Sequence, residues 1–169
     1  MKDEKNLSGE KGIEKLQHLV NEIKVCLFRT NLMIDDGLFC TPMTSQQVDN
    51  EGCIWFFSGL DSDINLEIKQ EKNVQLFFSH PGIGSYIVVN GDAEIIVSRS
   101  KVEELWSPLV KVWFHEGKDD PNISLIKVHT KEAHFWDSDD NRMVGFFKLV
   151  ASAVTGVNYL DGNEGKVNL

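Results

Sequence analysis

Residues 38–59 read LFCTPMTSQQVDNEGCIWFFSG, and this stretch decides the fold. Two strand-like runs, Leu38–Met43 and Cys53–Phe57, stand on either side of a turn at residues 50–52. Aromatic and β-branched runs bounded by turn residues are typical of a β-hairpin. Hydroxyl and amide side chains crowd the end of the first run, and Ser58 follows the second. An ordinary hairpin needs no such groups, so we predict that this one holds a ligand.

The remaining sequence predicts mostly short strands with a few helices. The further strands are Val25–Thr30, Val74–Ser79, Tyr86–Val97 with a bend at Gly91, Ser124–His129 and Ala133–Asp137. The helices are Gly12–Ile23, Ser62–Lys69, Ser100–Phe114 and Met143–Val154, and Tyr159–Leu169 shows no period. Seven or so strands at short spacing predict a small antiparallel β-barrel with flanking helices, a mainly β fold.

The bulk properties narrow the class of protein. A chain of 169 residues fits a single domain, 1–169, with residues 1–10 expected as a disordered tail. The net charge of −9 argues against a nucleic-acid partner or an anionic membrane. No secretory signal and no membrane span is found, and an odd count of 3 cysteines without CxxC spacing favours a reduced, cytoplasmic setting. We expect those cysteines to pack as small apolar residues.

Several motifs that resemble known sites are better explained without a ligand. Residues 61–65 and 137–141 have Asp-x-Asp-x-Asn spacing, but both lack the later glycine and glutamate of an EF-hand. Gly82 and Gly84 lack the third glycine of a dinucleotide loop. His129 and His134 would lie on adjoining strands, where packing is favoured over a zinc pair. No GxSxG-like elbow is present, and we predict no metal and name no catalytic residue.

The polar groups of the hairpin suit an anion. Trp55 and Phe56 are best explained as core, but the hydroxyls and amides around them are not. They lie close to the start of the helix that begins at Ser62. A helix N-terminus flanked by hydroxyls is a natural phosphate site.

A series of motifs follows in a fixed order from about Ile13 to the C-terminus. They are PMT at 42–44, QQVD at 46–49, WFFS at 55–58, ELW at 104–106, KVWF at 111–114, GKDDP at 117–121, WDS at 136–138 and VTG at 154–156. Each is weak alone, but their order is specific. In these motifs the chain resembles the FMN-binding split barrels related to pyridoxamine 5′-phosphate oxidase, in particular the general stress protein 26 branch.

The resemblance implies an FMN-binding split barrel of six to seven antiparallel strands and a homodimer with flavin sites at the subunit interface. The flavin ring would lie near Pro42, Met43 and Gln46, with Trp136 as a contact from near the other chain. The phosphate would lie between Thr41, Ser58 and the Ser62 helix. The cofactor residues so implied are Thr41, Pro42, Met43, Thr44, Gln46, Phe57, Ser58, Ser62, Asn65 and Trp136.

Two positions depart from the family pattern. Relatives usually carry Arg where this chain has Thr41, and often Lys where it has Ile64. Those cations pair with the phosphate, so their loss predicts weaker FMN binding. The leading expectation is an FMN-binding protein with flavin-dependent oxidoreductase activity. The alternative is a non-catalytic binding protein on the same fold, with a weakened or repurposed pocket.

Overall fold

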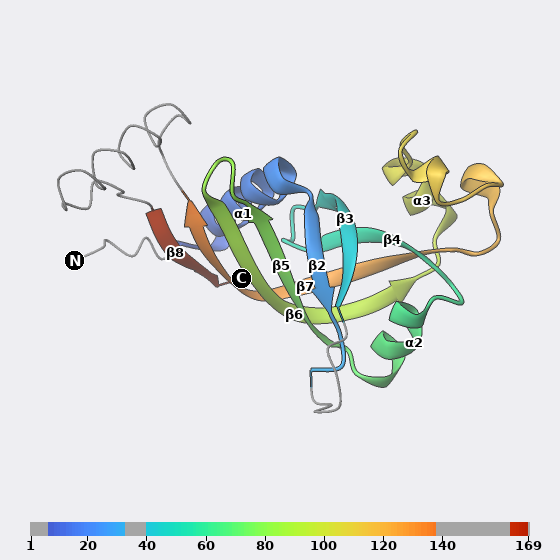
Figure 1. The fold of residues 1–169 in the computed structure, drawn as a ribbon, viewed down its shortest axis with the longest axis horizontal. Coiled ribbons are helices and arrows are strands. Elements are labelled where there is room, and N and C mark those ends of the chain that lie inside the picture. Colours follow the sequence, from blue (N-terminus) through green and yellow to red (C-terminus); the bar gives the residue numbers. More distant parts are fainter. Residues whose placement is uncertain (1–6, 33–39, 138–162, 169) are drawn as a thin grey trace.

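The computed structural model describes residues 7–32, 40–137 and 163–168 (Figure 1). The predicted helix Met143–Val154, residues 38–39 of the hairpin and the predicted motifs at 138 and 154–156 lie outside the described residues. In chain order the elements are β1 (Leu7–Ser8), α1 (Gly9–Ile23), β2 (Val25–Arg29), β3 (Cys40–Val48), β4 (Ile54–Gly59), α2 (Asp63–Gln70), β5 (Asn73–His80), β6 (Ser85–Ile96), α3 (Arg99–Leu105), the short 3₁₀ turns η1 (Val110–Val112) and η2 (Gly117–Asp119), β7 (Ile123–Asp137) and β8 (Asn163–Asn168).

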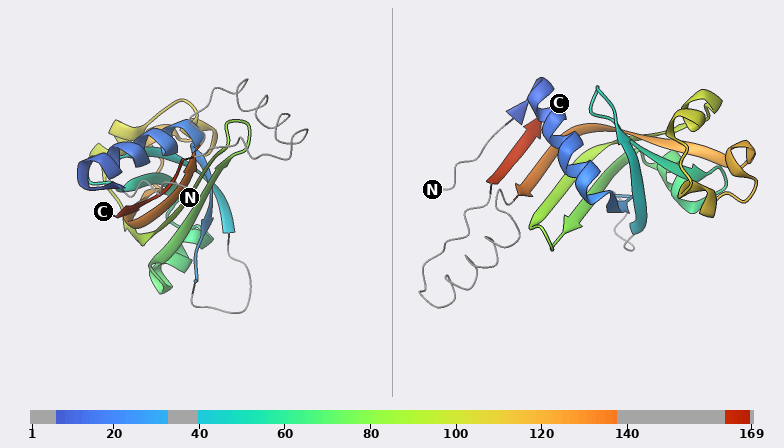
Figure 2. Two further views of the ribbon diagram at one scale, coloured as in Figure 1. Left: turned by 90° about the vertical axis from the view of Figure 1, so that its left-hand side faces the viewer. Right: turned by 90° about the horizontal axis from the view of Figure 1, so that it is seen from above.

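The strands form a closed antiparallel barrel, as predicted. Their order is β7-β4-β3-β2-β5-β6, and β6 pairs again with β7 to close the ring. Strand β7 is long enough to pair with β4 through its first half and with β8 through its last residues. Strand β1 extends the sheet beyond β8 in parallel. The chain therefore has a mainly β split-barrel fold with helices placed around it (Figures 1 and 2).

Helix α1 closes the apolar interior of the barrel. Its buried residues Leu16, Leu19, Val20 and Ile23 keep helical spacing and join the barrel core. The helix begins at Gly9, earlier than predicted, and Leu7–Ser8 pair with β8. The expected disorder of residues 1–10 is therefore wrong for residues 7–10, and the expected irregular tail is wrong for residues 163–168. Backbone pairing of these two ends supplies the order that their polar sequence does not indicate.

Strand β3 continues through the polar residues where the hairpin sequence predicted its end. Its backbone pairs with β2 on one side and with β4 on the other, and a β-bulge lies between Ser45 and Gln47. The two ladders hold the backbone extended whatever the side chains are. The hydroxyls and amides of residues 44–47 therefore lie along a strand and not beyond it.

Strand β7 is one continuous element where two strands were predicted. A register shift opposite Asn90 and Gly91 leaves Lys131 as the extra residue of a bulge, so the polar residues between the predicted strands stay within the ladder. Gly91 lies at this shift, as the predicted bend requires. A Cβ atom at Gly91 would lie 2.5 Å from the carbonyl oxygen of His129, so the close approach of the two backbones needs glycine here.

Helix α3 is shorter than predicted. It ends at Leu105, and η1 follows after Pro108. Proline disfavours the helical conformation of the residue before it, which explains why the apolar period beyond Ser107 does not form one helix. The short segments still cover a second apolar cluster on the outer side of β4 and β7, formed by Trp55, Val102, Val110, Phe114, Ile123 and Leu125.

Candidate functional site

Cross-strand pairing places an apolar row on the outer face of the barrel. The row runs across five strands through Pro42, Leu27, Phe77, Val88 and His134. A second row beside it contains Thr44 and Val25 at one end and Tyr86 and Trp136 at the other. The alternate residues of these strands, such as Phe28, Phe78 and Phe135, are buried in the core, so these rows face outward.

The predicted ring-contact residues divide between the two faces of β3. Pro42 and Thr44 are exposed on the outer face, and Gln46 lies in the bulge. The Gln46 Nε2 donates to the carbonyl oxygen of Thr44 at 3.0 Å, which leaves its Oε1 available as an acceptor. Met43 lies on the other face and packs against the barrel core. The structure therefore brings Pro42, Thr44 and Gln46 together and separates Met43 from them.

Ser58 and Asn65 lie inside the barrel and bond to each other through Ser124. The Ser58 and Ser124 hydroxyl oxygens are 2.8 Å apart, and Asn65 Nδ2 donates to Ser124 Oγ at 2.9 Å. Asn65 and Ser124 are fully buried. Asn65 Oδ1 accepts no hydrogen bond from any described residue. The Ser58 hydroxyl and the Asn65 amide, which were expected to bind a ligand, are therefore used within this internal network, and no local sequence pattern indicates it.

The N-terminus of α2 offers backbone donors in an acidic setting. Ser62 is the N-cap residue, as predicted, but its hydroxyl donates to the Gly59 carbonyl at 2.7 Å and not to the helix. The amides of Asn65 and Leu66 bond to the Ser62 carbonyl. The helix geometry leaves the amides of its first two residues for a ligand. The exposed carboxylates of Asp61 and Asp63 lie beside them in the chain and oppose an anion.

The two departures from the family pattern occupy different environments. Thr41 is exposed on β3 and pairs with Phe28. Ile64 is 7% exposed and belongs to the barrel core. A cation fits the position of Thr41 with little cost, whereas a lysine at 64 has to replace a core side chain.

Trp136 lies on the outer face, in the half of β7 that pairs with β6 and β8 and not with β4. The path from β3 to this half through β2, β5 and β6 is four strand spacings, roughly 19 Å along the curved sheet at about 4.8 Å per strand. The next residue, Asp137, accepts from Lys15 Nζ at 2.5 Å and from the Ser85 hydroxyl at 3.0 Å. Burial alone would raise the pKa of Asp137, but the hydrogen bond and charge of Lys15 outweigh it, so the pKa is below its ordinary value. This ion pair joins α1 to the end of β7.

The aromatic run of β4 is held by polar groups that sequence reasoning did not single out. Phe57 packs edge-on against Trp106, with ring centroids 5.9 Å apart. Trp55 Nε1 donates to Asp49 Oδ2 at 2.8 Å, and Lys101 Nζ lies 4.7 Å from the ring centroid of Trp55. Lys101 Nζ also donates to Gln47 Oε1 at 2.9 Å. In the sequence, only the i, i+6 spacing of Asp49 and Trp55 around the turn could have indicated the hydrogen bond between them.

The motifs set aside in the sequence occupy ordinary positions in the part of the chain that the structure describes. Asp61 and Asp63 are exposed while Asn65 is buried, so these three residues do not form a calcium loop. His129 and His134 lie on one strand, β7, and not on adjoining strands, because the strand is continuous. Cys26 and Cys53 are buried and Cys40 is half-buried, and all three thiols are free. Burial raises the pKa of Cys26 to about 12.

Comparison with known proteins identifies the family. A model of the family described as pyridoxamine 5′-phosphate oxidase like matches residues 11–160. The chain belongs to the pyridoxamine 5′-phosphate oxidase-like family. It is 24% identical over 109 residues to Protein bli-3 of Neurospora crassa, a match that covers 60% of this chain and 52% of that protein. It is 28% identical over 81 residues to General stress protein 26 of Bacillus subtilis, covering 46% of this chain and 57% of that one.

Solved structures of the family share the fold. A general stress protein 26 homologue from Jannaschia superposes with a TM-score of 0.77 at 19% identity, over 95% of this chain and 100% of the other. The general stress FMN/FAD binding protein of Xanthomonas citri gives a TM-score of 0.66 at 25% identity, over 79% and 93% of the two chains. These relatives support the general stress protein 26 branch of the family. The chain spans only 52% and 57% of the lengths of the two curated relatives above.

The residues of this family member suit the two ends of an FMN molecule unequally. The ring end has an exposed proline, a hydroxyl and an amide oxygen beside an apolar outer row, which fits a flat ring edged with polar groups. The phosphate end has backbone amides but no cation among the residues of the α2 N-terminus, and its buried free group, Asn65 Oδ1, is an acceptor. A phosphate needs donors, so this end fits it poorly. None of the helices among the described residues is both long and apolar enough to cross a membrane.

Proposed function

We propose that the protein binds a flavin on the outer face of β3, with FMN as the preferred form, and that it acts as a flavin-dependent oxidoreductase of its family. The observation that carries the proposal is the pair of exposed residues Pro42 and Thr44, with the half-buried Gln46 close by, at the edge of an apolar row. The Xanthomonas citri neighbour is described as binding FMN or FAD. When bound, the flavin would supply the redox chemistry, and the chain would bind and orient it.

The outer face also supports a homodimer. Leu27 is 49% exposed and Val25 is 53% exposed in these apolar rows. An exposed apolar surface of this kind marks an interface. A twofold pair of chains would bury both rows and would bring Trp136 of one chain toward the β3 residues of the other. Within a single chain these residues are apart, because Trp136 lies in the part of β7 that pairs with β6 and β8 and not with β4.

The phosphate end predicts modest rather than strong preference for FMN. The free amides of α2 and the exposed Thr41 hydroxyl would be the donors in this chain. Asp61 and Asp63 oppose the phosphate, and the first turn of α2 carries an acidic residue and no cation. The affinity for FMN is therefore expected to fall below that of relatives that keep both cations.

A second candidate function rests on the network of Ser58, Ser124 and Asn65. Because these side chains bond to one another inside the barrel, the phosphate end resembles core more than an open pocket. This favours a non-catalytic binding protein that kept the barrel and changed its ligand.

A reconstitution experiment distinguishes the two functions. The purified protein is incubated with FMN, passed through a desalting column and examined by visible absorption. The flavin proposal predicts a retained flavin spectrum with about one FMN per chain, and reduction of that flavin by a chemical reductant with reoxidation in air. A matched variant, Thr44→Glu, places a charge against the ring and should lose retention, while Ser100→Glu on the exposed start of α3 should not. Loss of all flavin from the unmodified protein would favour the second function.

A further inference from the structure

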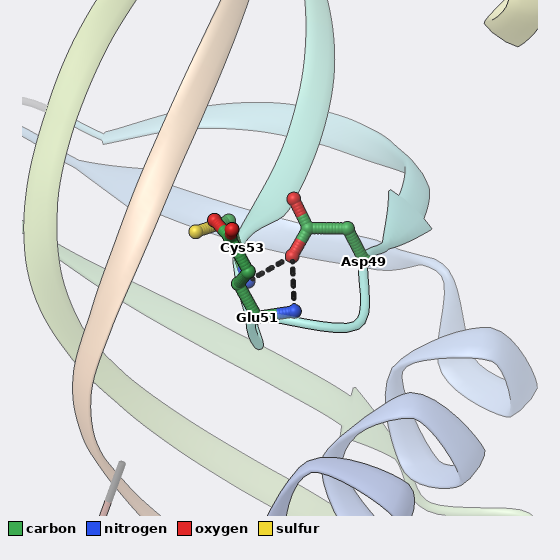
Figure 3. A group of neighbouring side chains, drawn as sticks. All are labelled: Asp49, Glu51 and Cys53. Atoms are coloured by element: carbon green, nitrogen blue, oxygen red, sulfur yellow. Dashed lines mark hydrogen bonds between the residues drawn. The ribbon is translucent and has the colours of Figure 1, made fainter.

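A cluster of metal-ligating side chains lies at the turn between β3 and β4, away from the proposed ring site. Asp49, Glu51 and Cys53 each present one ligand atom, and these atoms lie within 4.8 Å of one another (Figure 3). His129 of β7 lies beside Cys53 but outside this group, with its Nδ1 3.6 Å from Cys53 Sγ. The cysteine and histidine are 76 positions apart in the sequence, so no spacing motif reveals them.

We propose that Cys53, His129 and Glu51 bind a zinc ion at this turn. A thiolate, an imidazole and a carboxylate are the ligand types that zinc takes in proteins, and three protein ligands leave a fourth position for water. The proposal is independent of the flavin site.

The distance between sulfur and nitrogen agrees with a tetrahedral ion. Bonds of about 2.3 Å to sulfur and about 2.05 Å to nitrogen, at a tetrahedral angle, place the two ligand atoms about 3.6 Å apart. Cys53 Sγ and His129 Nδ1 are 3.6 Å apart. An ion can therefore lie between these two atoms, and the exposed Glu51 carboxylate would turn toward it as the third ligand.

A carboxylate already orients the histidine. His129 Nε2 lies 3.1 Å from Glu94 Oε2 on the neighbouring strand β6. When Nε2 carries the proton and donates to Glu94, Nδ1 keeps a lone pair directed toward Cys53. Histidine ligands of metals regularly make such a bond to a second carboxylate through the other ring nitrogen.

Asp49 makes the turn rigid. Its Oδ1 accepts from the backbone amides of Glu51 and Cys53 at 3.0 and 2.9 Å (Figure 3). Its Oδ2 accepts from Trp55 Nε1. These bonds fix the positions of two of the three proposed ligands. They also occupy most of the Asp49 lone pairs, so we assign Asp49 to positioning and not to the ion.

The charge balance around the turn favours a cation. Asp49, Glu51 and Glu94 contribute carboxylates, and the nearby cation is Lys127, whose Nζ is 3.7 Å from Glu51 Oε2. This distance is beyond a strong hydrogen bond, so Lys127 competes weakly for Glu51. The side chains of His129 and Glu51 are 47% and 79% exposed, which leaves the ion a path from solvent. Binding would release the thiol proton of Cys53.

Cobalt and zinc titrations of the reduced full chain test the proposal. Cobalt added to chelator-treated protein should give a thiolate-to-cobalt charge-transfer band and the strong visible bands of tetrahedral cobalt, and one equivalent of zinc should abolish both. A zinc competition assay with a coloured chelator then gives the affinity of each variant. Glu94→Gln should weaken zinc binding roughly tenfold, since it removes only the orienting carboxylate. Cys53→Ser, His129→Gln and Glu51→Gln should each weaken it more.

The chain supplies matched controls. His134→Gln changes another β7 histidine, which bonds to Glu132 at 2.8 Å and to no cysteine among the described residues. Cys40→Ser changes another free thiol. Both should bind zinc as tightly as the unmodified chain. If Cys53→Ser does not fold, the zinc affinity of His129→Gln is the test, because His129 is half-exposed and its replacement should not affect folding. An absent charge-transfer band, or equal zinc affinities of His129→Gln and His134→Gln, would overturn the proposal and leave an ordinary thiol–imidazole hydrogen bond.

Discussion

Thr41 is the residue whose replacement best probes the phosphate end of the proposed site. It is exposed, and it stands where the family resemblance leads us to expect an arginine. We expect Thr41→Arg to tighten FMN binding by about tenfold or more, because a charge-assisted hydrogen bond contributes about 1.5–3 kcal/mol. Riboflavin affinity should be unchanged, and the gain should shrink with added salt. Flavin fluorescence titration measures both ligands. An FMN affinity that does not respond to Thr41→Arg would mean that the phosphate does not lie near β3.

Asp137 gives a pH dependence of stability. Its pKa is lowered from 3.8 in the folded state, chiefly by Lys15 against the opposing effect of burial. A lowered folded pKa stabilises the protein above the unfolded pKa, and the contribution is lost as the pH falls through the folded value. Asp137→Asn should therefore lower the free energy of unfolding by about 1–3 kcal/mol at neutral pH and by less below pH 3.8.

Urea denaturation at several pH values measures this difference. Asp119→Asn is a suitable control, because that carboxylate pairs with Arg99 on the exposed surface. A deficit of Asp137→Asn that stays constant from neutral pH to pH 3 would show that the lost packing, and not the ion pair, explains the effect.

Sequence reasoning identified ligand-like residues at the hairpin but not the direction of their side chains. Pro42 and Thr44 face outward, whereas Met43 and Ser58 face the interior. The β-bulge between Ser45 and Gln47 shifts the alternation of β3 beyond Ser45, and its position depends on the pairing with β4. The partner that engages Ser58 is Ser124, which is 66 positions away. Such contacts arise because the closed barrel brings distant strands together, so the local sequence pattern does not predict them.

At the scale of elements, the close pairing of β6 and β7 at the bulge depends on Gly91. Its Cβ would meet the His129 carbonyl oxygen at 2.5 Å, a backbone atom that has no room to move. We expect Gly91→Ala to lower the free energy of unfolding by about 1–3 kcal/mol through overpacking. Urea denaturation measures it, with Gly82→Ala as the control, because there the nearest atom belongs to the movable ring of His80 at 3.3 Å. Equal losses in the two variants would contradict this account of the bulge.

The accuracy with which each element was predicted depends on how clear its local sequence pattern is. Helix α1 and strands β2, β5 and β6 lie within a few residues of the predicted bounds because their period and turn residues are clear. Strand β8 was missed, since its residues, NEGKVN, have little strand propensity and are held by pairing with β7 and β1. Two predictions were wrong. Strand β7 was predicted as two strands because the bulge within it is not visible in the sequence pattern, and α3 was predicted too long although Pro108 ends the helical conformation before it.

At the scale of the whole molecule, the outer apolar rows predict a dimer. Leu27 is near the centre of these rows. Leu27→Glu should therefore shift the protein from twice the 19.1 kDa chain mass to a single chain mass, because it would bury a charge in the interface. Light scattering at micromolar concentration is the measurement.

A matched control comes from the other side of the barrel. Leu109 is 79% exposed beside η1, and Leu109→Glu should leave the mass unchanged. If the unmodified chain is monomeric, or if Leu109→Glu dissociates it and Leu27→Glu does not, the assigned interface is wrong.

The central claim is a flavin site with a weak phosphate end, and the comparison of FMN with riboflavin tests it most directly. The two ligands share the ring and differ in the phosphate. Fluorescence titration of the unmodified protein should show that both bind and that FMN binds up to about tenfold more tightly, as a helix N-terminus without a cation allows. Absence of binding by both flavins would contradict the ring site, and equal affinities would contradict the phosphate end.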